Sequence, residues 1–319
     1  MDLAVAAAGL AILLGAGDAL VRGAVALSLR LGVPALIVSL TIVAFGTSAP
    51  ELLIAIEGAL ADADGIVYGN VVGSNTANIL LVLGAPALIS RLDARRSDCF
   101  DDYLLMLGVS VLFIALCFWG PLSWPQGLLL LAILGYVLWD AWRSAQAHRR
   151  AGAAEAELAE GVDPADAGIP AWRIALFLVA GLIGLPVGAS MLIDGARGMA
   201  EAFGVSEAAI GLTLVAVGTS LPELATTVAA AMRRHADVAI GNVIGSNLFN
   251  IVAVMGVASL VSPLTAPERF LTVDLWVMLA CSVLLFPFVR GMAVMGRWVG
   301  VAFLALYLAY VAAAFAPSL

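Results

Sequence analysis

Charge is scarce in this chain: only 12% of its 319 residues are Asp, Glu, Lys or Arg, and all 15 basic residues are arginines. Hydrophobic residues make up 63%, whereas a soluble domain has about 45–50% apolar and about 25% charged residues. A net charge of −8 without a dense basic patch argues against nucleic-acid binding. Three cysteines, an odd number, exclude a disulfide framework. The composition therefore predicts a polytopic membrane protein.

Apolar segments of the length that crosses a bilayer, about 20 residues, recur ten times along the chain. They lie at roughly 3–28, 34–60, 66–89, 100–119, 124–142, 172–197, 206–232, 238–261, 272–289 and 298–315. Short turns separate most of them, so little of the chain remains for a separate soluble domain. We predict an all-α membrane protein with ten transmembrane helices.

The distribution of arginine predicts the orientation, because cytoplasmic loops carry an excess of basic residues. One set of loops holds all the arginines except Arg197 and Arg269. This set includes the longest loop, 143–171, which we therefore expect in the cytoplasm, with both termini outside. The compact loops, and a start without a targeting segment, favour the inner membrane of a prokaryotic cell.

An internal duplication relates the two halves of the chain at a constant offset of 172 residues. The segment Gly46-Thr47-Ser48-Ala49-Pro50-Glu51-Leu52 recurs as Gly218-Thr219-Ser220-Leu221-Pro222-Glu223-Leu224. Gly69-Asn70-Val71-Val72-Gly73-Ser74-Asn75 likewise recurs as Gly241-Asn242-Val243-Ile244-Gly245-Ser246-Asn247.

Each copy would contain five spans, and an odd number makes the second copy enter the membrane from the opposite side. Such inverted-topology repeats are typical of secondary transporters. We predict a first five-helix repeat over 1–145 with its motif at 40–84, and a second over 171–319 with its motif at 212–256. An acidic cytoplasmic linker over 146–170 would join them.

The repeated motifs hold the polar residues of the apolar spans. Glu51 and Glu223 are ionisable groups inside these spans, where such residues are costly and usually functional. Each follows a proline, Pro50 or Pro222, whose missing N–H frees a carbonyl one turn back and disturbs the helix. The motifs also supply hydroxyl and amide oxygens from both repeats: Thr47, Ser48, Ser74, Asn78, Thr219, Ser220, Ser246 and Asn250.

All these ligand candidates are oxygens, which suit hard cations such as Ca²⁺ and Na⁺. Two carboxylates balance one Ca²⁺, or two or more Na⁺, and competition for them is a direct route to exchange. No nucleophile–base pair, phosphate loop or metal-ligand spacing indicates an enzyme, and we expect no cofactor. A closed polar centre between inverted repeats also speaks against a channel.

The two motifs resemble the α-repeats of the cation/Ca²⁺ antiporter superfamily, and most closely those of the prokaryotic Na⁺/Ca²⁺ exchangers. The resemblance implies a core of the second, third, seventh and eighth helices, across which the first and sixth slide. It implies that Glu51 and Glu223 are shared ion ligands, with Thr47 and Thr219 beside them. For the Na⁺ sites it implies Ser48, Ser74, Ser220 and Ser246, and the backbone carbonyls of Ala44 and Ala216.

Asn78 and Asn250 depart from part of this family, because some of its exchangers carry Asp at the second position. The core then has two carboxylates and not three, which argues against the K⁺-dependent branch. We expect exchange of Na⁺ for Ca²⁺ by alternating access, with the two ions as substrates. A Ca²⁺/H⁺ antiporter, or one of another divalent cation, on the same scaffold is the alternative. The bilayer is the expected surrounding, with no nucleic acid and no obligate protein partner.

Overall fold

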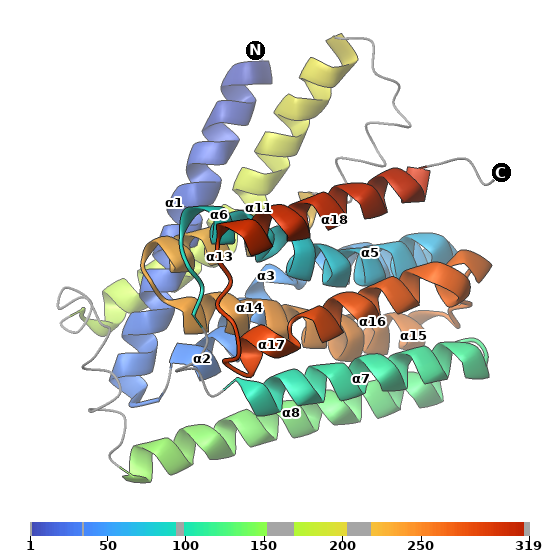
Figure 1. The fold of residues 1–319 in the computed structure, drawn as a ribbon, viewed down its shortest axis with the longest axis horizontal. Helices are drawn as coiled ribbons and strands as arrows, with labels where there is room; N and C mark the ends of the chain where they lie inside the picture. The colour runs from blue at the N-terminus through green and yellow to red at the C-terminus, as the bar shows by residue number, and fades with distance from the viewer. Residues whose placement is uncertain (1, 34, 94–98, 152–168, 203–217, 316–319) are drawn as a thin grey trace.

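A computed structural model describes residues 2–33, 35–93, 99–151, 169–202 and 218–315. Over these residues the protein is helical, and its only β contacts are two isolated bridges. In Figure 1, α7, α8, α16 and α18 run in similar directions, whereas α1 and α11 cross them steeply. The predicted all-α polytopic fold is confirmed.

The helices of the first repeat, where η denotes a π-helical turn, are these: α1 (Asp2–Leu31), α2 (Ala35–Val38), η1 (Ser39–Val43), α3 (Ala44–Thr47), α4 (Ala49–Leu60), α5 (Asp64–Ala77), η2 (Asn78–Val82), α6 (Gly84–Ile89), α7 (Phe100–Trp119) and α8 (Trp124–Ala151). Those of the second repeat are α11 (Ala171–Ala202), α13 (Leu221–Met232), α14 (Ala236–Phe249), η3 (Asn250–Met255), α15 (Gly256–Val261), η4 (Phe270–Asp274), α16 (Leu275–Leu284), α17 (Phe286–Val289) and α18 (Arg297–Phe315).

These helices account for the predicted spans. By length and composition, seven continuous helical stretches could cross a membrane, and the pair Ala35–Thr47 and Ala49–Leu60, bent by 43°, forms an eighth. The shorter apolar helices Leu221–Met232 and Arg297–Ala313 coincide with the remaining two. Residues 206–217, the start of the predicted seventh span, lie outside the described residues.

The fifth span is longer than its apolar segment predicts, because α8 continues from the expected end at 142 to Ala151. The added turns consist mainly of Ala, Arg and Gln, which are good helix formers, so the helix persists beyond its apolar part. The rest of the predicted acidic linker, 152–168, lies outside the described residues. The repeat boundaries stay a prediction.

The centre of the fold is formed by α5–α6 and α14–α15, the most deeply buried of the candidate spans. A π-helical turn interrupts each of them, η2 from Asn78 and η3 from Asn250. Such turns occur frequently at functional sites. Because Asn78 and Asn250 are equivalent in the duplication, both repeats are distorted at the same polar residue.

Tertiary contacts follow the duplication as well. Leu92 pairs with Met295 across one isolated bridge, and its repeat equivalent Leu264 pairs with Leu122 across the other. Asp62 and Arg234, also equivalent, both have left-handed backbone, with φ of 53° and 63°. Equivalent residues thus have equivalent surroundings, as an approximate two-fold relation between inverted repeats requires.

Small residues allow α1 and α11 to pack closely along their length (Figure 1). Gly9 on α1 lies against Leu192 on α11, and its repeat equivalent Gly181 lies against Leu20. Gly188 faces the backbone of α1 in the same way. Without strong hydrophobic driving force between helices in lipid, close van der Waals contact of this kind is the main source of helix association.

The middle of α1 is held to the core by charge. Asp18 forms an i,i+4 ion pair with Arg22 at 3.2 Å. It also pairs at 2.6 Å with Arg233, the residue that follows α13. The second pair, which joins α1 to a different span, was not predicted.

Replacing Gly188 with Val should weaken the contact between α1 and α11. The new Cβ would lie 2.7 Å from the Leu13 nitrogen and 2.9 Å from the Gly9 oxygen, and backbone atoms cannot yield as a side chain can. Overpacking of this kind costs about 1–3 kcal/mol, so the detergent-solubilised variant should melt at a lower temperature. Gly15→Val is the control, since Gly15 is exposed and its Cβ would meet nothing within 4 Å. Equal melting temperatures would contradict the packing role.

Candidate cation-binding site

Both glutamate motifs lie at breaks between helices. In the first repeat, α3 ends at Thr47 and α4 begins at Ala49, and Ser48 between them has φ −84° and ψ 4°. In the second repeat, Ser220 has φ −85° and ψ 1° before α13. Each proline lies in the first turn that follows, where no helical bond needs its missing N–H and its fixed φ suits the helix. The predicted disturbance of the helix is confirmed, and it falls just before the proline.

The breaks put Glu51 and Glu223 in the first turns of α4 and α13. Their side chains are 1% and 0% exposed. The two carboxylates are close enough for their charges to interact, and Glu223 lies near the Thr47 and Ser48 hydroxyls. Among the described residues no arginine or histidine forms an ion pair with either glutamate. Two buried acidic groups thus lie without a countercharge from the part of the chain that the structure describes.

Several oxygens in this region have no hydrogen-bond partner among the described residues. Leaving a buried polar atom unpaired costs about 1–3 kcal/mol. Seven belong to groups that are equivalent in the two repeats, and an eighth is in the second repeat alone: the hydroxyls of Ser48 and Ser220, Oε2 of Glu51, both carboxylate oxygens of Glu223, and Oδ1 of Asn78, Asn250 and Asn242. Such a set of oxygens fits a cation, which would supply the missing partner.

Hydroxyls from opposite repeats meet in the same region. The Thr47 hydroxyl lies 3.4 Å from that of Ser246. The Ser74 hydroxyl lies 3.5 Å from that of Thr219. These two contacts are equivalent under the duplication, and all four residues are buried. The structure thus brings together hydroxyls that the sequence places in four separate motifs.

Of the two predicted carbonyl ligands, Ala44 and Ala216, the structure describes only that of Ala44. The Ala44 carbonyl accepts hydrogen bonds from the Ser48 N–H at 3.0 Å and the Thr47 hydroxyl at 3.2 Å. Coordination of an ion by this oxygen would therefore compete with the Thr47 hydroxyl. Ala216 lies outside the described residues.

Asn70 and Asn242 also contact the glutamate helices, and the sequence reasoning did not select them. Asn70 donates at 2.8 Å to the main-chain oxygen of Glu51. Asn242 donates instead to the Thr226 hydroxyl at 3.0 Å, which in turn donates to the main-chain oxygen of Glu223 at 2.9 Å. The sequence could have indicated them, because the same Gly-Asn pair occurs in both copies of the motif.

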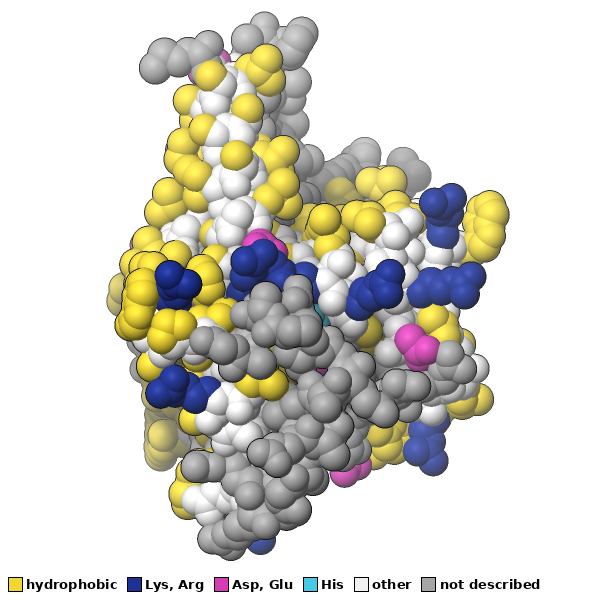
Figure 2. Space-filling model, turned by 90° about the vertical axis from the view of Figure 1, so that its left-hand side faces the viewer, with side chains coloured by type: hydrophobic (Ala, Val, Ile, Leu, Met, Phe, Trp, Pro, Cys, Tyr) yellow, Lys and Arg dark blue, Asp and Glu magenta, His cyan; other side chains and the backbone are white. Residues whose placement is uncertain are grey.

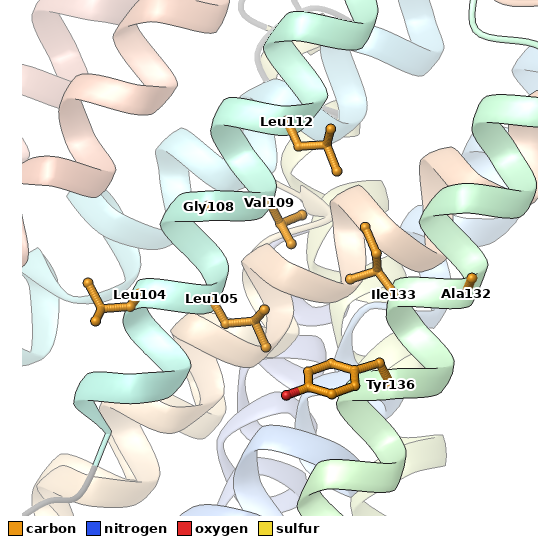
Figure 3. Close-up of a pocket in the computed structure, with 8 residues that line it drawn as sticks. All are labelled: Leu104, Leu105, Gly108, Val109, Leu112, Ala132, Ile133 and Tyr136. Carbon is orange, nitrogen blue, oxygen red and sulfur yellow. The ribbon is translucent and has the colours of Figure 1, made fainter.

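The cavity shown in Figure 3 is a separate feature. It has a volume of about 460 Å³ and lies between α7 and α8. Its lining is almost wholly apolar: Leu104, Leu105, Gly108, Val109, Leu112, Ala132, Ile133 and Tyr136. It contains no carboxylate and none of the predicted ligands, so it is not a cation site.

Among the described residues no three or more His, Cys, Asp or Glu side chains gather to hold a metal ion. The candidate site instead combines two carboxylates with neutral oxygens at broken helices of two repeats. Broken helices at a repeat interface are the usual build of substrate sites in secondary transporters. The fold and the site define a secondary transporter of cations.

Comparison with known proteins defines the family. The family model described as "Sodium/calcium exchanger protein" matches residues 1–142 and 173–316. The sodium/calcium exchanger MaX1 of Methanosarcina acetivorans is 32% identical over 96% of each chain. The inner membrane protein YrbG of Escherichia coli K12 is 37% identical over 86% of this chain and 85% of its own. A solved structure of the sodium–calcium exchanger NCX_Mj, soaked without Na⁺ and Ca²⁺, superposes with a TM-score of 0.83 at 32% identity, covering 98% of each chain.

The chain belongs to the sodium/calcium exchanger family. It is therefore a multi-pass membrane antiporter and not an enzyme. The resemblance noted in the sequence motifs is confirmed over nearly the whole chain.

Cation binding should raise the thermal stability of the protein. A ligand that binds only the folded state adds RT ln(1 + [L]/Kd), about 2.7 kcal/mol at a concentration 100-fold above Kd. Titration of Ca²⁺ into Na⁺-free, detergent-solubilised protein should raise the melting temperature, whereas choline chloride of equal ionic strength should not. The Glu51→Gln/Glu223→Gln double variant should show no shift. A Ca²⁺-dependent shift that persists in this variant would mean that the ion binds elsewhere.

Proposed function

We propose that this protein exchanges Na⁺ for Ca²⁺ across the membrane at a single site shared between Glu51 and Glu223. The observation that carries the proposal is the pair of fully buried carboxylates without a cationic partner among the described residues. Unpaired oxygens from both repeats surround them. Membership of the sodium/calcium exchanger family supports the choice of ions.

The remaining ligands in this proposal are neutral oxygens. They are the side chains of Thr47, Ser48, Ser74, Asn78, Thr219, Ser220, Ser246 and Asn250, and the carbonyls of Ala44 and Ala216. Hydroxyl, amide and carbonyl oxygens are hard ligands that both ions accept. The two ions would differ chiefly in how many are needed to balance two negative charges.

Shared carboxylates explain why transport would be coupled. A Ca²⁺ ion balances both glutamates and excludes Na⁺, whereas more than one Na⁺ is needed for the same balance. An empty site would leave two unpaired charges in a medium of low dielectric, which costs several kcal/mol per ion. Only a site that holds ions would then switch readily between access to one side of the membrane and access to the other. Each switch therefore carries one kind of ion, and the return carries the other, which is an exchange.

The orientation is also part of the proposal: the loop 143–171 in the cytoplasm and both termini outside. Figure 2 shows the molecular face at the left of Figure 1, and arginine side chains are spread across it with few acidic ones visible. Arg233 and Arg234, between α13 and α14, belong to the arginine-rich set of loops. An excess of basic residues on one side is the usual mark of the cytoplasmic face.

Replacing either glutamate with glutamine should abolish coupled transport. In proteoliposomes with Na⁺ inside and ⁴⁵Ca²⁺ outside at equal pH, the wild type should take up Ca²⁺. Glu51→Gln and Glu223→Gln should each lower uptake by more than about tenfold, since the remaining carboxylate balances only half the charge of Ca²⁺ and losing one partner of a buried ion pair costs about 3–5 kcal/mol. Wild-type uptake in both variants would contradict the site.

Two controls sharpen this experiment. Glu57→Gln removes an exposed carboxylate from the same helix, and its repeat equivalent is Ala229, so uptake should be retained. An acid-inside gradient without Na⁺ tests proton coupling in the wild type. Uptake under this gradient alone would contradict Na⁺ coupling while leaving the glutamate site intact.

The inverted topology can be tested with a matched pair of cysteine variants. Asp62 and Arg234 are exposed, equivalent in the two repeats and alike in backbone conformation. In intact cells, a membrane-impermeant maleimide should label Asp62→Cys but not Arg234→Cys, and permeabilisation should expose both. The native cysteines Cys99, Cys117 and Cys281 are 0%, 4% and 4% exposed, so background labelling should be low. Equal labelling of both variants in intact cells would contradict the inverted arrangement.

A further inference from the structure

Asn75 and Asn247 connect the two repeats at the centre of the molecule. They are equivalent in the duplication, and each is 1% exposed. Nδ2 of Asn75 donates at 3.2 Å to the main-chain oxygen of Asn247, and Nδ2 of Asn247 donates at 3.2 Å to that of Asn75. Each amide therefore spans the repeat interface, and the two bonds form a reciprocal pair.

The same two side chains also contact two of the proposed ligands. Oδ1 of Asn247 accepts from Nδ2 of Asn78 at 3.0 Å. Oδ1 of Asn75 accepts from Nδ2 of Asn250 at 3.0 Å. Asn75 and Asn247 thus use both ends of their amides, whereas Oδ1 of Asn78 and of Asn250 has no partner among the described residues.

The direction of these bonds is set by the backbone. An amide side chain can be turned either way, and its neighbours decide which end is nitrogen. A main-chain carbonyl can only accept a hydrogen bond. Asn75 must therefore present its nitrogen to the Asn247 carbonyl, which leaves its oxygen for Asn250. Asn250 must then present its nitrogen to Asn75, so its own oxygen points away from the pair.

We propose that Asn75 and Asn247 are positioning residues that turn the amide oxygens of Asn250 and Asn78, and not their NH₂ groups, towards the cation. The inference rests on the proposed function of the site. Without the pair, Asn78 and Asn250 could rotate and offer a donor to a positive ion, which would repel it. Residues that orient a metal ligand commonly affect ion affinity 10–100-fold in this indirect way.

The pair also selects the residue type at the ligand positions. A carboxylate at 78 would set an acceptor against the Asn247 oxygen. The Asn247 amide cannot rotate to present its NH₂ group to that carboxylate, because its nitrogen already donates to the Asn75 carbonyl. A carboxylate at position 250 would likewise face the Asn75 oxygen, and the Asn75 nitrogen is already bound to the Asn247 carbonyl. An amide can donate at both positions without a proton being added, as a carboxyl group would need, and the site keeps two carboxylates.

Asn75→Leu tests the proposal, since leucine has a similar size but neither donates nor accepts. In proteoliposomes driven by a Na⁺ gradient, we expect the KM for ⁴⁵Ca²⁺ to rise by about tenfold. Thr76→Val is the matched control. Thr76 is buried beside Asn75, but its hydroxyl bonds its own helix at the Val72 oxygen, and its repeat equivalent is the apolar Leu248. Its KM should match that of the wild type.

A double-mutant cycle separates positioning from general support of the fold. If Asn75 acts through Asn250, then Asn75→Leu should change the KM of an Asn250→Ala protein by no more than about twofold, the usual limit for additive error. It should still cost about tenfold in an Asn78→Ala protein, because Asn78 depends on Asn247. Equal effects in the two backgrounds would overturn the proposal.

Each failure has a distinct reading. A wild type that does not take up Ca²⁺ under a Na⁺ gradient overturns the proposed function and this inference with it. A wild type that does so, with equal effects of Asn75→Leu in both backgrounds, overturns the positioning role alone. If Asn75→Leu is not monodisperse in detergent, the smaller Asn75→Ser, too short to reach Asn250 and the opposite carbonyl together, takes its place in the same cycle.

Discussion

The structure is organised around two buried carboxylates that no basic side chain among the described residues neutralises. Glu51 and Glu223 lie within range of each other's charge, with at most 1% of either residue exposed. Burial of like charges is unfavourable unless something positive joins them. The surrounding oxygens, unpaired among the described residues, have the same need. A cation in the central region would meet both needs, and a transporter of cations requires a region of this kind.

The internal duplication explains how the fold assembles this region from two halves. Each repeat contributes one glutamate, one helix break and one π-helical turn at an asparagine. The contacts that close the site cross between repeats, as Thr47 with Ser246 and Ser74 with Thr219 do. Neither repeat could form the site alone, because each supplies the partners that the other lacks.

The asparagines show how a neutral network can set the properties of a charged site. The reciprocal bonds of Asn75 and Asn247 end on main-chain carbonyls, whose polarity cannot be reversed. The orientation of these two amides in turn fixes that of Asn78 and Asn250, which donate to their oxygens. The arrangement provides neutral oxygens without adding negative charge, which an aspartate at either position would do.

The sequence by itself determined the membrane class, the duplication, the broken helices and the identity of the buried glutamates. These follow from local composition and from the chemistry of proline and carboxylate, which do not depend on distant residues. Only the tertiary structure decided which oxygens are left unpaired, that the Ala44 carbonyl is occupied, that Arg233 joins Asp18, and that Asn75 and Asn247 bond across the repeats. The duplication shows that residues 172 positions apart are equivalent, but not that they touch, so hydrogen bonds such as that of Asn75 with Asn247 become visible only when the two repeats are packed together.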